Sequence, residues 1–199
     1  MEDQPANDAI RGVLSLATAQ SLVDEIGRLK DQVVQLEAHV SELEELAHID
    51  PLVRLPNRRG LFRDLENFIA RLNRYGGTAA LIFVDIDGLK RINDRFGHST
   101  GDAALIRIAQ ILVENVRDSD PVGRLSGDEF VILLSDVDEL AAWNMALRIV
   151  EATVASSSPI NSYRVALSIA VGVSVINAGD QPEDVISRAD KAMYRIKAA

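Results

Sequence analysis

Residues 79–96 read AALIFVDIDGLKRINDRF, and this stretch decides the fold. Its first six residues are apolar without interruption, which is typical of a strand buried within a sheet. Asp85 closes the run, and Gly88 begins a turn that leads into a short helical pattern over 89–96. A buried strand that passes directly into a helix indicates an α/β domain with carboxylates at one end of its sheet.

Helical and strand patterns alternate on both sides of this stretch. Asn57 is typical of a helix N-cap, and apolar residues at helical spacing follow it. The tetrapeptide at 126–129, Ser-Gly-Asp-Glu, separates two short apolar runs and predicts a β-hairpin with an acidic tip. We therefore predict an α/β sandwich with a mixed sheet. The expected helices are 58–75, 89–96, 102–117, 140–155 and 182–197, and the expected strands are 79–85, 122–125, 130–134 and 163–175.

A heptad pattern precedes this domain. Leucines at the d positions and β-branched residues at most a positions favour a two-stranded parallel coiled coil, although a single amphipathic helix packed on its own domain is the alternative. We expect residues 1–18 to be a flexible polar leader, 19–48 a dimeric coiled coil and 49–199 the globular domain. The a positions are Ile26, Val33, Val40 and Ala47, and the d positions are Leu22, Leu29, Leu36 and Leu43.

Charge and composition exclude several classes of function. The chain has 21 Lys and Arg against 30 Asp and Glu, and a net charge of −9 argues against a general nucleic-acid or anionic-membrane binder. The absence of cysteine excludes disulfides, thiolate metal sites and cysteine nucleophiles. No apolar run approaches the roughly 20 residues of a spanning helix, and the start does not resemble a signal peptide. We therefore expect a soluble, cytoplasmic protein.

Three carboxylates are expected to meet at one edge of the sheet. Asp85 ends the first strand, and Asp128 and Glu129 lie in the hairpin turn. Converging acids repel one another unless a cation lies between them, and Mg²⁺ takes one or two carboxylates with phosphate oxygens and water. Backbone N–H groups after Gly88, together with Lys90, can hold phosphates. These residues predict a metal-bound nucleoside triphosphate, although solvated or helix-capping acids give the same pattern.

Taken together, the motifs resemble one family. They are DIDGLKRINDRFGHSTGD at 85–102, RLSGDEF at 124–130 and RADKAMYRIK at 188–197, and DPLVRLPNRR at 50–59 is similar to the segment that opens the family's domain. The chain is identified as a member of the GGDEF family of diguanylate cyclases. This resemblance implies a fold like that of nucleotidyl cyclases and polymerase palms. It also implies a reaction in which two GTP become cyclic di-GMP and two pyrophosphates.

The resemblance implies a role for each matching residue. Asp85, the Ile86 carbonyl and Asp128 would bind Mg²⁺ or Mn²⁺, and Glu129 would assist the metals or the deprotonation of the attacking 3′-hydroxyl. Asn93 and Asp102 would read the guanine edge, although Asn93 could instead be a helix-surface residue and Asp102 a helix N-cap. The remaining substrate contacts would come from Gly88, Leu89, Lys90, Gly127 and Lys197.

A second binding site is implied by the string Arg-Asp-Ser-Asp at 117–120, which stands where the family often carries an inhibitory RxxD motif. Arg117 can bind a guanine or a phosphate, and Asp120 can pair with a base N–H. Arg148 on the next helix is a second candidate anchor. We expect cyclic di-GMP to bind here and inhibit, whereas an ordinary charged helix end would give the same short string.

The resemblance also implies pairing of two chains, because each domain of this family holds one GTP and supplies half of the reaction centre. The coiled coil would supply this homodimer by raising the local concentration of one domain around the other. Ser126 departs from the signature's first glycine, Leu89 replaces a usual aromatic, and the sequence ends at Ala199, before a Gly-Arg-Asn-like tail and any further domain such as an EAL phosphodiesterase. We expect catalysis to be retained, with a GTP or cyclic di-GMP receptor as the alternative.

Overall fold

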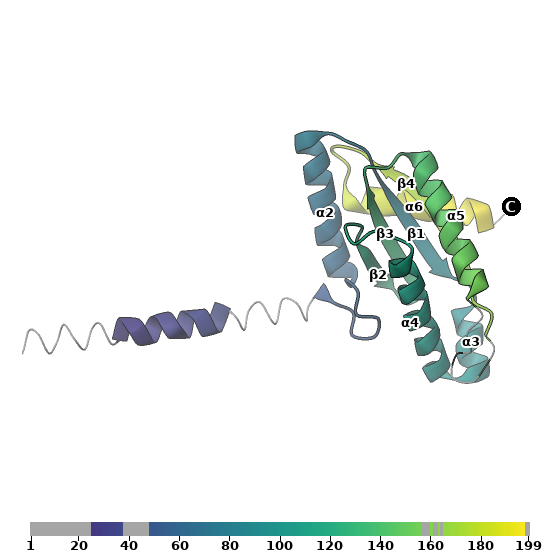
Figure 1. Ribbon diagram of the computed structural model, residues 1–199, viewed down its shortest axis with the longest axis horizontal. Coiled ribbons are helices and arrows are strands. Elements are labelled where there is room, and N and C mark those ends of the chain that lie inside the picture. The colour runs from purple at the N-terminus through teal and green to yellow at the C-terminus, as the bar shows by residue number, and fades with distance from the viewer. Residues whose placement is uncertain (1–24, 38–47, 157–159, 161–162, 164, 198–199) are drawn as a thin grey trace, which may run out of the picture. The chain divides into compact units, whose positions relative to one another are not determined.

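The computed structural model describes residues 25–37, 48–156, 160, 163 and 165–197 (Figure 1). By its internal contacts the chain divides into two units, Met1–Leu46 and Ala47–Ala199. The predicted flexible leader, 1–18, lies outside the described residues. No helix among the described residues is long and apolar enough to cross a membrane.

The described part of the first unit, residues 25–37, is helical. Its predicted seam residues are exposed in the single chain, as are the other described residues of this helix: Ile26 52%, Leu29 49%, Val33 51% and Leu36 64%. The dimer itself stays a prediction, and the remaining seam residues, Leu22, Val40, Leu43 and Ala47, lie outside the described residues.

Four strands form the sheet of the second unit, in the order β2-β3-β1-β4. They are β1 (Ala79–Ile86), β2 (Val122–Ser126), β3 (Glu129–Ser135) and β4 (Ile169–Ile176). The predicted α/β architecture and the hairpin are confirmed. All three pairings are antiparallel, where the sequence alone indicated a mixed sheet.

Helices cover both faces of the sheet, which explains why β1 is apolar without alternation. The first face packs against α4 (His98–Glu114) and α5 (Glu139–Ala155), with α3 (Leu89–Phe96) beside α4. The other face packs against α2 (Arg58–Tyr75) and α6 (Pro182–Lys197). Alternate residues of β1 serve the two cores: Ala80, Ile82 and Val84 the first, Leu81 and Phe83 the second.

Two predicted elements have wrong boundaries, the helix at both ends, since it stops at Glu114, and the strand at its start. The helix predicted over 102–117 is α4, which begins four residues earlier because the chain turns at Gly97 and bonds the N–H groups of Thr100 and Gly101 to the Gly97 carbonyl. The strand predicted over 163–175 begins only at Ile169. Residues 165–168 keep the alternation of buried and exposed side chains, but β1 ends at Ile86, the partner of Ile169, so the strand pairing ends there.

The loop between β4 and α6 is held by an ion pair. Arg188 of α6 donates to both carboxylate oxygens of Asp180, at 3.2 and 2.6 Å, and also to Ser174 Oγ and the Val175 carbonyl. Burial raises the pKa of Asp180, but the hydrogen bonds and charge of Arg188 outweigh it. The pKa of Asp180 therefore lies below its usual value of 3.8. This places α6 against the edge strand β4.

Candidate active site

Antiparallel pairing brings the predicted carboxylates to one end of the sheet. Asp85 of β1 lies directly opposite Glu129 of β3. The Ile86 N–H donates to the Asp128 carbonyl at 3.1 Å, so the tip of the hairpin lies beside the end of β1. The turn itself consists of Gly127, whose φ is 25°, and Asp128. Asp85 thus shares one edge with Asp128 and Glu129, which lie more than 40 residues later in the sequence.

Lys197, from the last turn of α6, reaches this edge. Its Nζ lies 2.5 Å from Asp85 Oδ1 and 3.3 Å from Asp87 Oδ1. Burial lowers the pKa of Lys197, but hydrogen bonds and charge from Asp85 and Asp87 outweigh it and raise the pKa above its usual 10.5. The sequence indicated Lys197 as a phosphate ligand, and here it neutralises the carboxylates.

The donor set at this edge fits a hard divalent cation. Asp85, Asp128, Glu129 and the Ile86 carbonyl offer only oxygen ligands, and a lysine ammonium already lies against Asp85. Among the described residues no three Asp, Glu or His side chains stand close enough to form a closed metal site. Because Mg²⁺ usually takes only one or two carboxylates and completes its shell with phosphates and water, an open site of this kind fits it.

The turn after β1 presents backbone donors. Gly88 adopts a left-handed conformation with φ of 70° directly before α3, and no side chain caps the helix. The first N–H groups of α3 therefore have no side-chain acceptor, which suits an anionic phosphate. Lys90 on the first turn is exposed, and Leu89 is buried in the core. Leu89 thus contributes its backbone to this turn and its side chain to the core.

The two predicted guanine-reading residues lie on neighbouring helices. Asn93 of α3 is half-buried and its Oδ1 is buried without a hydrogen-bond partner among the described residues. Asp102 is exposed on α4. The alternative that Asp102 caps a helix is wrong, because α4 begins at His98 with Gly97 as its N-cap. The Asp102 carboxylate is therefore not used to begin the helix.

Sequence reasoning missed the residue pair that holds the hairpin. Arg124 donates to both oxygens of Asp50, at 3.3 and 3.1 Å, and to the Gly127 carbonyl, at 3.1 and 2.6 Å. Both residues lie in the motifs at 50–59 and 124–130, but nothing in the spacing of those motifs indicates that they pair. Ser126 donates its hydroxyl to Glu129 and does not require a positive φ. Serine at this position therefore does not strain the turn.

The predicted inhibitory residues gather at the turn between α4 and β2. Arg117 and Arg148 are exposed, and Arg148 donates to the Asn115 carbonyl at 3.4 Å. Asp120 is only 5% exposed, and its carboxylate accepts hydrogen bonds from the Ser135 N–H and hydroxyl, both at 3.3 Å. Asp120 therefore orders the turn, whereas the two arginines are accessible.

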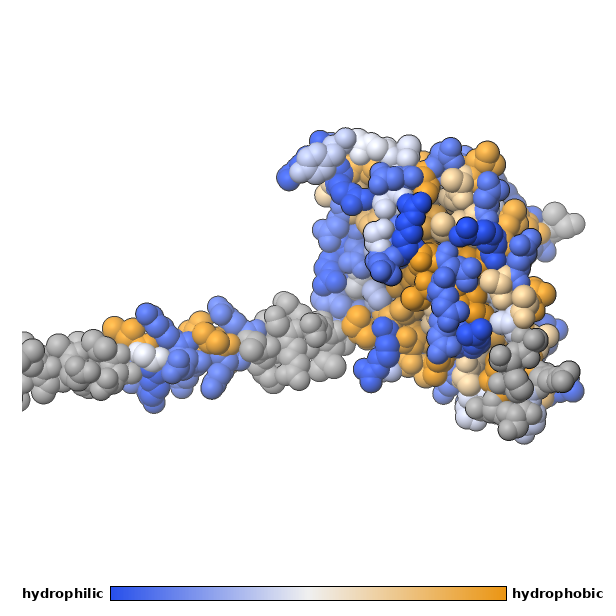
Figure 2. Space-filling view, viewed as in Figure 1, coloured by the Kyte–Doolittle hydropathy of each residue, from blue (hydrophilic) through white to orange (hydrophobic). Residues whose placement is uncertain are grey.

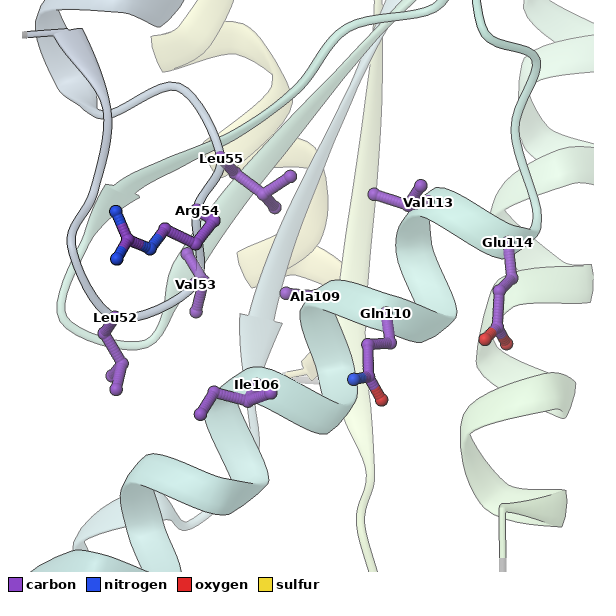
Figure 3. Close-up of a pocket in the computed structure, with 9 residues that line it drawn as sticks. All are labelled: Leu52, Val53, Arg54, Leu55, Ile106, Ala109, Gln110, Val113 and Glu114. Atoms are coloured by element: carbon purple, nitrogen blue, oxygen red, sulfur yellow. The ribbon is translucent and has the colours of Figure 1, made fainter. Parts of the chain in front are cut away.

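A separate apolar groove of about 390 Å³ lies between the loop at 52–55 and α4. Figure 3 shows Leu55 and Val53 of the loop across from Ala109 and Ile106 of the helix. Apolar residues also lie exposed on α4 and α5, and Figure 2 shows hydrophobic surface interspersed with hydrophilic residues on the face of the domain toward the viewer. None of the predicted site residues lines this groove.

Comparison with known proteins now identifies the family. The family model described as diguanylate cyclase, GGDEF domain, matches residues 47–199. The chain therefore belongs to the GGDEF domain family, which confirms the resemblance inferred from the motifs.

Two curated relatives are diguanylate cyclases. The chain is 34% identical over 180 residues to diguanylate cyclase DgcP of Pseudomonas aeruginosa, covering 90% of this chain and 27% of that protein. It is also 34% identical to diguanylate cyclase DosC of Escherichia coli, covering 96% of this chain and 43% of that protein. The chain thus spans less than half the length of either relative.

Solved structures agree with the fold. The GGDEF domain of YfiN (TpbB) from Pseudomonas aeruginosa superimposes with a TM-score of 0.67 at 34% identity, covering 73% of this chain and 92% of that one. The coiled coil and GGDEF domain of DgcB from Caulobacter crescentus, in complex with c-di-GMP, gives a TM-score of 0.80 over 89% of this chain and 95% of that one. Its identity is 24%, so it supports the fold alone.

Proposed function

We propose that this chain is a diguanylate cyclase that condenses two GTP into cyclic di-GMP and two pyrophosphates. The observation that carries the proposal is the meeting of Asp85, Asp128 and Glu129 at one sheet end in a chain of the GGDEF family. The uncapped start of α3 beside these acids and the half-buried Asn93 one turn later supply the phosphate and base ends of a nucleotide site.

Asp85, Asp128 and the Ile86 carbonyl would hold Mg²⁺, or Mn²⁺ in its place. When bound, the metal stabilises negative charge on the attacking oxygen and on the departing pyrophosphate. Glu129 takes the proton of the 3′-hydroxyl, and the Ser126 hydroxyl fixes the orientation of its carboxylate. The 3′-oxygen then forms a bond to the α-phosphorus of the other GTP, and the bond to pyrophosphate breaks. A second such step closes the ring.

The substrate is held by the residues around this edge. The backbone N–H groups at Gly88 and Leu89 and the ammonium groups of Lys90 and Lys197 contact the β- and γ-phosphates. With a metal bound to the carboxylates, Lys197 would contact phosphate in their place, because its positive charge would be repelled by the metal. The Gly127 backbone lets phosphate approach the turn. Asn93 and Asp102 bind the guanine edge.

Two such domains must face one another, because one domain supplies the 3′-hydroxyl that attacks the other's GTP. The heptad spacing of apolar residues in the first unit supports a parallel coiled coil that pairs the domains. We also propose that cyclic di-GMP inhibits by binding the exposed Arg117 and Arg148, with Asp120 fixing the turn that presents Arg117. Cyclic di-GMP bound there would inhibit its own synthesis, as feedback on a bacterial second messenger.

A receptor that binds GTP or cyclic di-GMP without turnover is the second candidate, because Ser126 replaces the first glycine of the family signature. Comparison of the wild-type chain with Asp128→Ala and Glu66→Ala separates the two. Cyclic di-GMP formation should be lost in Asp128→Ala and retained in the control, since Glu66 is exposed on α2 and is not one of the proposed site residues. Equal, measurable rates of cyclic di-GMP formation in the wild-type chain and both variants would contradict the role of Asp128 as a metal ligand.

A further inference from the structure

The corner between α3 and α4 contains a buried oxygen that no donor satisfies. The two helices are separated by one residue, Gly97, and meet at the lower end of the domain in Figure 1. Asn93 lies one turn before the end of α3, and its Oδ1 is buried without a hydrogen-bond partner among the described residues. A buried unpaired acceptor is unfavourable and requires an explanation.

Gly101 of α4 lies against this amide. A Cβ at Gly101 would overlap Asn93 Oδ1 and would lie 2.8 Å from its Cγ and 3.3 Å from its Nδ2. Gly101 lies within a helix, where alanine is favoured over glycine, and its φ is not in the left-handed region. The backbone at this position therefore does not need glycine. The space for the Asn93 side chain does.

We infer that Gly101 is a positioning residue for guanine recognition. Its missing side chain leaves the space that the Asn93 side chain occupies against α4, so that the amide is held where it meets the guanine edge although its Oδ1 stays unpaired against the helix. This inference rests on the proposed function, because it takes the base to be guanine. Displacing the amide from that edge would also weaken the discrimination between guanine and adenine.

Calorimetry with the full chain tests the inference. The probe is the α,β-methylene analogue of GTP, in which the bond to the leaving group cannot break. Gly101→Ala should raise its Kd about tenfold, because the Asn93 amide is displaced, and should lower the preference over the matching adenosine analogue by a similar factor. In the Asn93→Ala background the same substitution should raise the Kd no further, since the displaced group is already gone.

The same double variant supplies a readout on folding. Asn93→Ala with Gly101→Ala has no overlapping atoms, so its Tm should equal or exceed that of Asn93→Ala, because alanine is the better helix former. An unchanged Kd in Gly101→Ala, additive losses in the double variant, or a lower Tm there would overturn the inference. Failure of the wild-type chain to bind the GTP analogue would instead contradict the proposed function and, with it, the choice of guanine.

Discussion

Arg124 links the hairpin turn of the candidate site to the segment that leads into the domain, and Arg124→Ala removes that link. Its guanidinium donates to both carboxylate oxygens of Asp50 and to the Gly127 carbonyl. The two side chains are only 16% and 17% exposed, so water compensates poorly for the lost contacts. The substitution should therefore lower stability and loosen the turn that carries Asp128.

The expected loss is about 2 kcal/mol. Hydrogen bonds to charged groups contribute roughly 1.5–3 kcal/mol, and breaking a fully buried ion pair costs roughly 3–5 kcal/mol. Asp50 keeps two donors after the change, the N–H groups of Leu52 at 2.9 Å and Val53 at 3.0 Å. Because the Asp50 carboxylate keeps these two hydrogen bonds, the loss of stability should fall in the range for a hydrogen bond to a charged group and not in the range for breaking a buried ion pair.

Urea unfolding followed by far-UV circular dichroism measures this loss. Arg63→Ala is the matched control, since Arg63 is 58% exposed and its nitrogen lies 3.6 Å from Asp64. A surface pair of this kind should cost less than about 1 kcal/mol. Asp50→Asn completes a double-variant cycle with Arg124→Ala and should show coupling between the two. Equal losses for Arg124→Ala and Arg63→Ala, or no coupling, would refute the reasoning.

Three further predictions follow from the leader helix and the second unit. Leu29→Glu combined with Leu36→Glu should give monomers in sedimentation equilibrium and little cyclase activity, whereas the control Val34→Glu, at a residue 63% exposed but off the seam, should keep the chain dimeric. A double variant that stays dimeric would count against the coiled coil. Arg54→Gly should raise the urea midpoint, by about 1 kcal/mol in stability, because Arg54 has φ of 59°, and a lower midpoint would contradict this. Asp180→Asn should lower stability at neutral pH, because the folded-state pKa of Asp180 is depressed. The difference in stability from the wild-type chain should be complete above about pH 3.8 and shrink as pH falls through the lowered pKa, so a difference that stays constant with pH would exclude a stabilising role for the Asp180 carboxylate.

Local signals in the sequence account for most of the fold. The uninterrupted apolar run of β1 and the short runs around the acidic tetrapeptide predicted a buried strand and a hairpin, and both are present. The same patterns placed Asp85 at the end of one strand and Asp128 and Glu129 in the hairpin turn, and the pairing of β1 with β3 brings them to the same edge. The start of α4 was wrong because Gly97 joins two helices directly, and the pattern of apolar residues does not mark such a corner.

Contacts between distant segments could not be predicted. The pairing of Lys197 with Asp85 joins residues 112 positions apart, and Arg124 with Asp50 joins residues 74 apart. Neither depends on periodicity or turn chemistry, because each arises from how a helix end or an entry loop packs on the sheet. Likewise, the close approach of Gly101 to Asn93 follows from the angle between two helices, which the spacing of residues within either helix does not determine.

The most direct test of the central claim is to identify the product. The wild-type chain, stripped of nucleotide, is incubated with GTP and Mg²⁺, and the products are separated by chromatography and quantified. The account predicts cyclic di-GMP with two pyrophosphates released for each molecule formed, and a plateau as the product binds its inhibitory site. No cyclic di-GMP, despite tight binding of GTP or of cyclic di-GMP, would contradict the cyclase and leave a nucleotide receptor in its place.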